Sequence, residues 1–236
     1  MKILVINPGG TSTKIAVFEE EKEELKVNLD HTAEELAPYK SISDQMPFRK
    51  EVILKTLTEK GYKLEDFDAV CGRGGMFKHI PSGTYAVNDA VIQDVINHPY
   101  GEHVANLGPY IAKELADTVS IPSFFVDPVC TDELEDIARY SGMKGFERQS
   151  FFHALNQKAV ARRASKQVGK SYEELNLIVV HLGGGVSVAA HHKGRVIDVN
   201  NVKDEGAMGM DRAGGVPVCQ LIDYCFSGVT HKEARK

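Results

Sequence analysis

The sequence of 236 residues lacks the features of several large protein classes. It has no excess of basic residues, because 28 Lys and Arg stand against 33 Asp and Glu. Binding nucleic-acid phosphates needs a basic surface, so we expect no nucleic-acid partner. No run approaches the ~20 apolar residues of a membrane helix, so we expect no membrane partner. With 42% hydrophobic and 26% charged residues, the composition is typical of a globular protein rather than a disordered one.

Cysteine is also scarce. The four cysteines, Cys71, Cys130, Cys219 and Cys225, form no Cys-x-x-Cys pair, which argues against a zinc ribbon or a thioredoxin-type motif. The apolar run after Met1 is too short for a signal peptide. Reduced thiols are typical of cytosolic proteins, and the sequence therefore predicts a cytoplasmic location.

Hydrophobic periodicity predicts an α/β protein. Strands are expected over residues 2–7, 12–18, 24–30, 67–71, 124–127, 176–182, 186–192 and 195–201. Helices are expected over residues 47–60, 88–96, 102–117, 132–140 and 153–168, with a weak one near 216–226. The chain thus opens with three successive strands, which favours an antiparallel meander over a βαβ unit.

Two glycine turns recur in matching contexts. Gly9-Gly10-Thr11-Ser12 follows the first strand, and Gly184-Gly185-Val186-Ser187 follows the strand at 176–182. The repetition suggests two similar domains that face one cleft. Glycine is common in turns, so a chance repeat and a plain tight hairpin remain alternatives.

Such turns are suited to binding phosphate, because glycine lets consecutive backbone N–H groups approach an anion closely. The hydroxyls of Thr11, Ser12 and Thr13 add donors to the first turn, and Lys14 adds a positive charge. A Walker A loop is excluded because GxxxxGK[ST] is absent. A Rossmann fingerprint is excluded because strands, not helices, follow both turns.

Four segments in this order resemble the acetate kinase family of the actin-like ATPase superfamily. LVINPGGTSTK at 4–14 is similar to its first phosphate motif and VVHLGGGVSVAA at 179–190 to its second. GRGGMFKHIPSGTY at 72–85 and FHALNQKAVARRA at 152–164 resemble butyrate kinases in particular. Two departures from acetate kinases favour the same branch: Glu102-His103-Val104-Ala105-Asn106 replaces a His-Asn-Pro-Ala-Asn run, and glycines replace the histidines that surround the arginine motif.

The resemblance implies two ribonuclease-H-like α/β domains with mixed β-sheets and a central cleft. The first domain is expected over residues 1–135 and the second over residues 136–236. Family members continue well beyond this length, and their later adenosine-binding glycine motif is absent from this sequence. The chain therefore resembles a C-terminally truncated member with an incomplete second domain. A homo-oligomer is the expected assembly.

The implied reaction transfers the γ-phosphoryl group of ATP to the carboxylate of a short-chain fatty acid, and butyrate is the expected acceptor. The implied cofactors are ATP or ADP and Mg²⁺. A carboxylate is already a nucleophile, so catalysis rests on positioning and on cations around the phosphoryl group. The alternatives are an acetate, propionate or branched-chain acid kinase, a nucleotide-binding switch module without an acid substrate, and a truncated chain that folds without catalysis.

By resemblance, four residues form the catalytic group. Arg73 would hold the substrate carboxylate, and Arg212 would stabilise the transferring phosphoryl group. His153 would hydrogen-bond phosphoryl oxygens. Asp127 ends a buried strand, and it would bind Mg²⁺ through water. Arg212 lies among glycines, where a solvated surface arginine is the plain alternative.

The same resemblance implies the remaining site residues. Asn7 would lie near both Mg²⁺ and the phosphoryl group, although asparagine before proline is also a common turn starter. His181 ends an apolar strand, where a satisfied core histidine is the alternative. Phe152 would line the acyl pocket or belong to the core, and the glycines around Arg73 would leave space for a longer acyl chain. The phosphate- and nucleotide-binding residues are Asn7, Gly9, Gly10, Thr11, Ser12, Lys14, His181, Gly183, Gly184 and Gly185.

Overall fold

The computed structural model describes residues 1–234. Contacts within the chain divide it into two compact units, and each unit is built from two stretches of sequence. The first unit comprises Met1–Glu133 and His153–Lys158, and the second comprises Leu134–Phe152 and Ala159–Lys236. The domain boundary expected after residue 135 stays a prediction.

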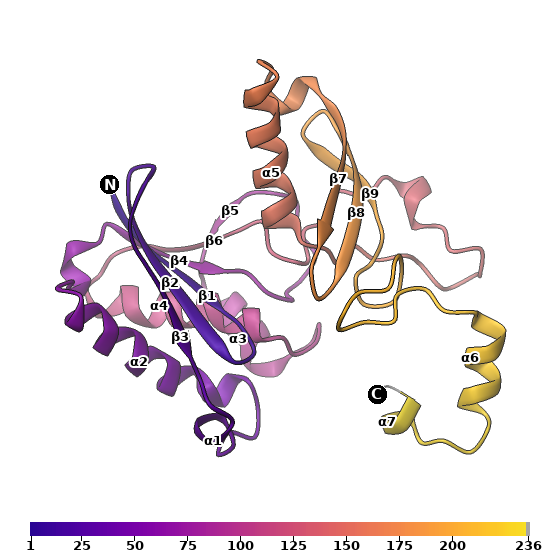
Figure 1. Ribbon diagram of the computed structural model, residues 1–236, viewed down its shortest axis with the longest axis horizontal. Coiled ribbons are helices and arrows are strands. Elements are labelled where there is room, and N and C mark those ends of the chain that lie inside the picture. The colour runs from indigo at the N-terminus through magenta and orange to yellow at the C-terminus, as the bar shows by residue number, and fades with distance from the viewer. Residues whose placement is uncertain (235–236) are drawn as a thin grey trace. The chain divides into compact units, whose positions relative to one another are not determined.

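A six-stranded mixed sheet forms the centre of the first unit (Figure 1). Its strands lie in the order β3-β2-β1-β4-β6-β5. Their bounds are β1 Lys2–Pro8, β2 Ser12–Glu19, β3 Lys22–Asp30, β4 Ala69–Arg73, β5 Thr84–Ala86 and β6 Ser123–Val126. The first three strands form the expected antiparallel meander, while β4 and β6 run parallel to β1. The mixed sheet is therefore confirmed.

Helices α2 and α4 cover one face of this sheet (Figure 1). Alternation along β1 directs Leu4 and Ile6 into the core, where they pack with Ile53 of α2 and Ile111 of α4. All four side chains are fully buried. The helices of this unit are α1 Ala33–Leu36, α2 Met46–Glu59, α3 Asp89–Asn97 and α4 Leu107–Thr118.

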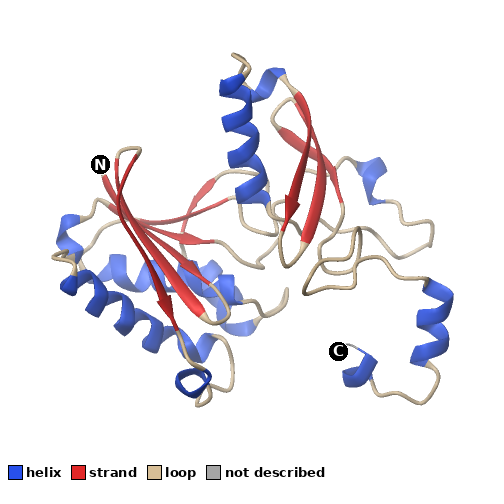
Figure 2. Cartoon of the chain, viewed as in Figure 1, coloured by secondary structure: helices blue, strands red, loops and turns tan. Residues whose placement is uncertain are grey.

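The second unit contains a three-stranded antiparallel sheet in the order β7-β8-β9. Its strands are β7 Asn176–Leu182, β8 Val186–His192 and β9 Arg195–Val199. Ala161, Tyr172 and Val179 form a small buried cluster beside this sheet. The remaining helices are α5 Ala154–Gln167, which begins in the first unit, α6 Val218–Cys225 and α7 His231–Ala234 (Figure 2).

Two local expectations from the sequence were wrong. The helix expected over 132–140 is only a 3₁₀ turn at Asp136–Arg139. The amide of Glu135, which would make the first bond of that helix, donates to the Ile197 carbonyl instead. The preceding amide of Asp132 donates to Ile80 and ties the segment to another part of the chain. The helix expected from residue 102 begins at Leu107, after a 3₁₀ turn at Val104–Asn106. The short edge strand β5 was missed.

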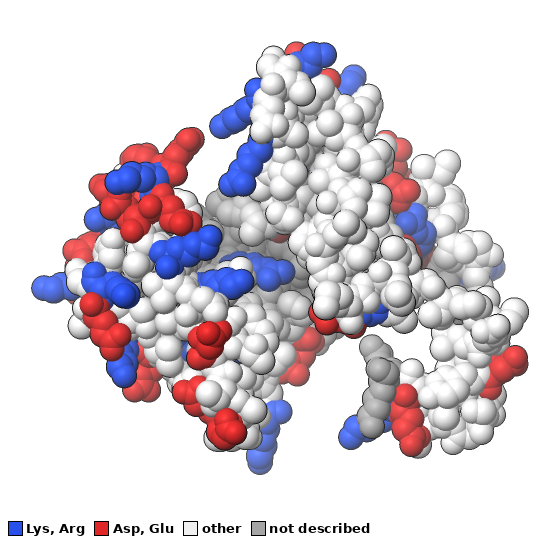
Figure 3. Space-filling view, viewed as in Figure 1, with Lys and Arg blue, Asp and Glu red and all other residues white. Residues whose placement is uncertain are grey.

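Two surface properties bear on the expected partners. No helix within residues 1–234 is long and apolar enough to cross a membrane. On the face of the first unit drawn in Figure 3, acidic and basic side chains are interspersed.

Candidate functional site

Three candidate residues lie at the carboxyl ends of neighbouring parallel strands. Ile6 of β1 lies beside Gly72 of β4, which lies beside Phe125 of β6. Asn7, Arg73 and Asp127 come at or just past these positions, so the sheet brings them to the same edge. In α/β proteins this is the edge where ligands bind.

Arg73 and Asn7 are in direct contact. The guanidinium Nη1 of Arg73 donates to Asn7 Oδ1 at 3.3 Å. Burial lowers the pKa of Arg73 below its usual range, but an arginine remains charged at neutral pH. The pair therefore presents a half-buried cation at the end of β4.

A cavity of about 220 Å³ lies in the first unit beside this pair. Most of its lining is apolar, and the residues are Val5, Ile6, Asn7, Cys71, Gly72, Arg73, Val126 and Leu155. Burial raises the pKa of Cys71 to about 11, so its thiol is neutral. A fixed cation beside apolar walls suits a ligand with one anionic end and one short apolar end.

The glycines around Arg73 serve packing rather than leaving open space. A Cβ on Gly72 would overlap the backbone of Gly108 in α4, and one on Gly75 would overlap Asn106. A Cβ on Gly74 would lie 2.7 Å from Pro128 Cβ. Gly72 lets α4 approach β4 closely, and at all three positions the space that a side chain would occupy is already filled.

Asp127 is fixed by its surroundings as well as by its strand. It is 2% exposed and adopts a left-handed backbone conformation with φ of 39°. Its Oδ1 accepts hydrogen bonds from Ser82 Oγ at 2.6 Å and from the Gly83 amide at 2.9 Å. A non-glycine residue in this conformation is strained, and such strain often accompanies functional positions.

The first glycine turn joins β1 to β2 and is held by a buried arginine of α2. Arg49 is fully buried and donates to the carbonyl oxygens of Gly9, Gly10 and Ser12 at 3.0 to 3.1 Å. Our sequence reasoning missed this residue. The available signal was its spacing, since Arg49 lies between Met46 and Ile53 on the buried face of α2.

The second glycine turn joins β7 to β8 and contacts the loop that carries Arg212. The amide of Asp211 donates to the Gly184 carbonyl at 3.0 Å, and a Cβ on Gly184 would overlap the Asp211 carboxylate. A Cβ on Gly183 would lie 2.9 Å from His181 Nε2, so this imidazole lies against the turn. The structure thus brings together four predicted residues, His181, Gly183, Gly184 and Arg212.

The Arg212 side chain is half-buried, and it has no hydrogen bond or ion pair within residues 1–234. The loop around it is closed by backbone bonds from Gly209 to Arg212 at 2.9 Å and from Gly215 to Gly206 at 2.9 Å. The guanidinium of Arg212 therefore has no partner among residues 1–234, and it lies on a loop that is hydrogen-bonded to the second glycine turn.

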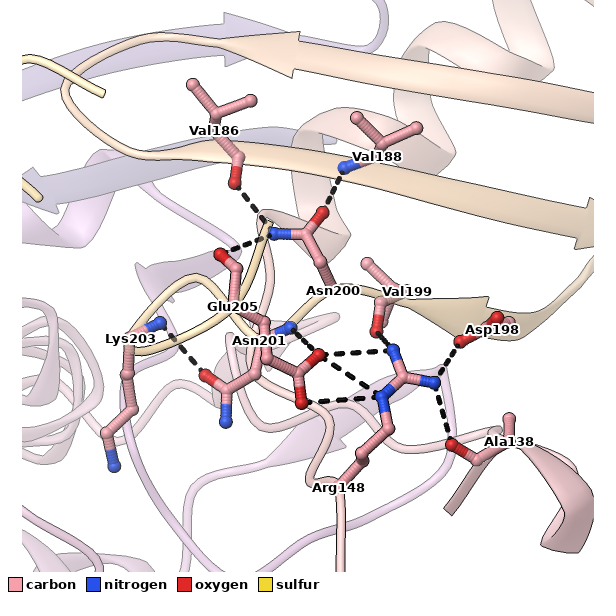
Figure 4. A network of polar contacts seen from close by, with 10 residues as sticks. All are labelled: Ala138, Arg148, Val186, Val188, Asp198, Val199, Asn200, Asn201, Lys203 and Glu205. Atoms are coloured by element: carbon pink, nitrogen blue, oxygen red, sulfur yellow. Dashed lines mark hydrogen bonds and ion pairs between the residues drawn. The ribbon is translucent and has the colours of Figure 1, made fainter. Parts of the chain in front are cut away.

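A polar network centred on Arg148 supports the start of this loop (Figure 4). Arg148 pairs with Glu205 at 3.1 Å and with Asp198 at 2.9 Å, and it donates to the carbonyls of Ala138 and Val199. The side chain of Asn200 then bonds to the backbone of Val186 and Val188 on β8 and to Glu205. These contacts connect the loop, β8 and β9.

Comparison with known proteins identifies a family domain in the chain. A model of the acetokinase family matches residues 138–216. A curated protein named probable butyrate kinase, from Clostridium botulinum strain Eklund 17B, is 57% identical over 228 residues, which is 96% of this chain. The chain carries an acetokinase-family domain. It spans 64% of the length of that curated relative.

Solved structures of an acetate kinase and a propionate kinase have the same fold. The acetate kinase of Porphyromonas gingivalis superposes with a TM-score of 0.72 at 21% identity, over 99% of this chain and 66% of its own. A propionate kinase of Francisella tularensis gives a TM-score of 0.70 at 19% identity, over 98% of this chain and 66% of its own. At these identities the comparison establishes the fold alone.

The predicted acetokinase site residues thus fall into two groups, one in each unit. The first unit holds Asn7, Gly9, Gly10, Thr11, Ser12, Lys14, Arg73, Asp127 and His153. The second unit holds Phe152, His181, Gly183, Gly184, Gly185 and Arg212. His153 immediately precedes α5 and is half-buried, whereas Phe152 is fully buried, as a core residue would be. Their functional roles stay predictions.

Proposed function

We propose that this chain carries the acid-binding and phosphate-binding parts of a carboxylate kinase. The enzyme transfers the γ-phosphoryl group of ATP to a short-chain fatty acid and forms an acyl phosphate and ADP. The observation that carries the proposal is Arg73, a half-buried cation at the rim of an apolar cavity of about 220 Å³. Arg73 binds the carboxylate of the acid, and the apolar wall takes its alkyl chain.

Phosphate binding rests on the two glycine turns. In the first turn, exposed Gly10, Thr11 and Lys14 offer backbone donors and a positive charge to an anion. In the second turn, Gly184 and its neighbours bind phosphate beside Arg212, whose guanidinium stabilises charge on the transferring group. His153 and His181 donate hydrogen bonds to phosphoryl oxygens.

Magnesium is the proposed metal. Within residues 1–234 no group of three or more His, Cys, Asp and Glu side chains could hold a metal ion. A site with few protein donors suits Mg²⁺, because Mg²⁺ keeps several waters and is held by one or two carboxylates together with substrate phosphates. Asp127 supplies the carboxylate and Asn7 the amide oxygen. When bound, Mg²⁺ offsets the negative charge of the phosphate oxygens.

Butyrate is the acid we propose, on the strength of the 57% identity to a probable butyrate kinase. Straight and branched acids of neighbouring length are the competing substrates. We also propose a homo-oligomer and a cytoplasmic location, and the four free cysteines support the latter.

The test is acyl phosphate formation by this chain with ATP and Mg²⁺, trapped with hydroxylamine. Acetate, propionate, butyrate, isobutyrate and valerate are compared side by side. We expect a signal that is largest at four carbons. A maximum with acetate would contradict the butyrate assignment. ATP hydrolysis that no acid affects would favour a nucleotide-binding switch instead, and no acyl phosphate with any acid would show that this chain alone is not a kinase.

A further inference from the structure

The feature that the proposed mechanism leaves unused is the buried side chain of Arg49 in α2. Its Nη1 donates to the carbonyls of Gly9 and Ser12, both at 3.0 Å, and to Thr13 Oγ1 at 2.9 Å. Its Nη2 donates to the Gly10 carbonyl at 3.1 Å. One guanidinium therefore holds three carbonyls of a single turn.

These bonds decide which way the turn amides face. In a trans peptide the C=O and the following N–H point in opposite directions. Because Arg49 binds the carbonyls of Gly9 and Gly10, the amides of Gly10 and Thr11 point away from it. Both residues are exposed, and within residues 1–234 neither amide donates to a protein acceptor.

Arg49 also places an uncompensated positive charge beneath the turn. No carboxylate lies within ion-pair distance of it among residues 1–234. Burial lowers the pKa of Arg49 to about 10, so the group is charged at neutral pH. A buried charge without a counter-ion is unfavourable for folding by itself. Here oxygen dipoles from the turn, Thr13 and Gln45 offset that penalty.

We propose that Arg49 is a positioning residue for phosphate binding, holding the turn carbonyls so that the amides of Gly10 and Thr11 face a phosphate group. The inference rests on the proposed function, because it takes the first turn as a phosphate site. Arg49 does not touch the phosphate itself. Its charge adds a positive potential behind the turn.

The experiment uses the 236-residue chain labelled with ¹⁵N. Inorganic pyrophosphate and, separately, ATP with Mg²⁺ are titrated while the amide signals of Gly10 and Thr11 are followed. The variants are Arg49→Met and Arg49→Lys. Lys50→Met is the matched control, because it removes a positive charge from the next position of α2, where Lys50 pairs with Glu114 at 3.0 Å. Circular dichroism establishes which variants are folded.

We expect the wild-type signals of Gly10 and Thr11 to move with both ligands. Arg49→Met should raise the pyrophosphate Kd by at least ~10-fold, which corresponds to about 1.4 kcal/mol. Arg49→Lys should restore part of the affinity, since lysine keeps the charge but cannot span several carbonyls. Lys50→Met should bind like wild type.

Two results would overturn the inference alone. One is a folded Arg49→Met variant that binds pyrophosphate as tightly as wild type. The other covers an Arg49→Met variant that does not fold: Arg49→Lys keeps the charge but cannot span the carbonyls of Gly9, Gly10 and Ser12. If that variant kept the wild-type Kd and the wild-type Gly10 and Thr11 signals, Arg49 would not position the turn for phosphate. Wild-type signals that no ligand moves would instead remove the phosphate role of the turn and the inference together.

Discussion

The backbone N–H of Asp211 donates to the carbonyl oxygen of Gly184 at 3.0 Å. This bond fastens the loop that carries Arg212 to the second glycine turn. Gly209 allows the close approach, because a Cβ at that position would overlap the Gly184 carbonyl oxygen. The position of Arg212 therefore depends on a backbone contact that only glycine permits.

Replacing Gly209 by alanine should separate the loop from the turn. The overlap is with backbone, which cannot rotate away, and overpacking of this kind costs about 1–3 kcal/mol. Hydrogen exchange of the Asp211 amide should accelerate by ~5-fold to ~150-fold as that bond opens. The control is Gly215→Ala in the same loop, where the nearest atom would lie 3.6 Å from the new Cβ. Equal Asp211 exchange rates in the two variants would contradict the packing argument.

Arg212→Ala should reduce kcat for acyl phosphate formation by ~10²-fold or more, as expected for loss of a preorganised charge stabiliser. Its side chain has no protein partner within residues 1–234, so stability should change by less than about 0.5 kcal/mol. Steady-state kinetics and thermal unfolding measure the two effects. A kcat close to wild type would remove Arg212 from the mechanism.

Arg73→Ala should act mainly on the acid. If Arg73 binds the carboxylate equally in the ground and transition states, KM for the acid rises, by ~10-fold or more, while kcat changes little. The KM for ATP, measured in the same assays, serves as the internal control and should stay the same. An unchanged KM for butyrate would disprove the assignment.

Arg148→Met should destabilise the second unit. It removes charge-assisted hydrogen bonds to Glu205 and Asp198 and two bonds to backbone carbonyls. Because the side chain is 24% exposed, we expect a loss of about 2–4 kcal/mol in the free energy of unfolding. Urea titration measures it. Arg163→Met, an exposed change on α5 in the same unit, should stay within about 0.5 kcal/mol of wild type.

His31 should make stability depend on pH. Burial is the main cause that lowers the pKa of His31, and the nearby charge of Arg49 is the second. In the unfolded chain the pKa of a histidine is about 6.5. The stabilisation is therefore fully present above that value and is lost as pH falls through the folded-state pKa. Urea midpoints from pH 7.5 downward should fall more steeply for wild type than for His31→Asn. If the urea midpoints of wild type and His31→Asn changed in parallel with pH, His31 would have the same pKa in the folded and unfolded chains.

Much of the fold could be predicted because its signals are local. Alternating apolar residues predicted β1, β2 and β3, and the helical spacing predicted α2 and α5 to within one residue at each end. Glycine turns are also local, since the backbone freedom of glycine is a property of one residue. Family motifs then indicated the site residues in each unit, whose roles remain predictions.

Other features depend on partners that are distant in the sequence. The segment at 132–135 has a helical pattern, yet its amides bond to Ile80 and Ile197. The glycines around Arg73 suggest open space, yet Gly108 and Asn106 of another segment fill it.

The sequence by itself determined the strands, the two glycine turns and the family resemblance, because each is encoded in short runs of residues. Only the tertiary structure decided what supports the turns. Arg49 lies some 40 positions from the carbonyls it holds, and Arg148 lies 57 positions from Glu205. Such a side chain is either a solvated surface charge or a buried group that binds backbone carbonyls. Which of the two it becomes depends on the backbone oxygens that the fold brings to it, and no local pattern specifies those oxygens.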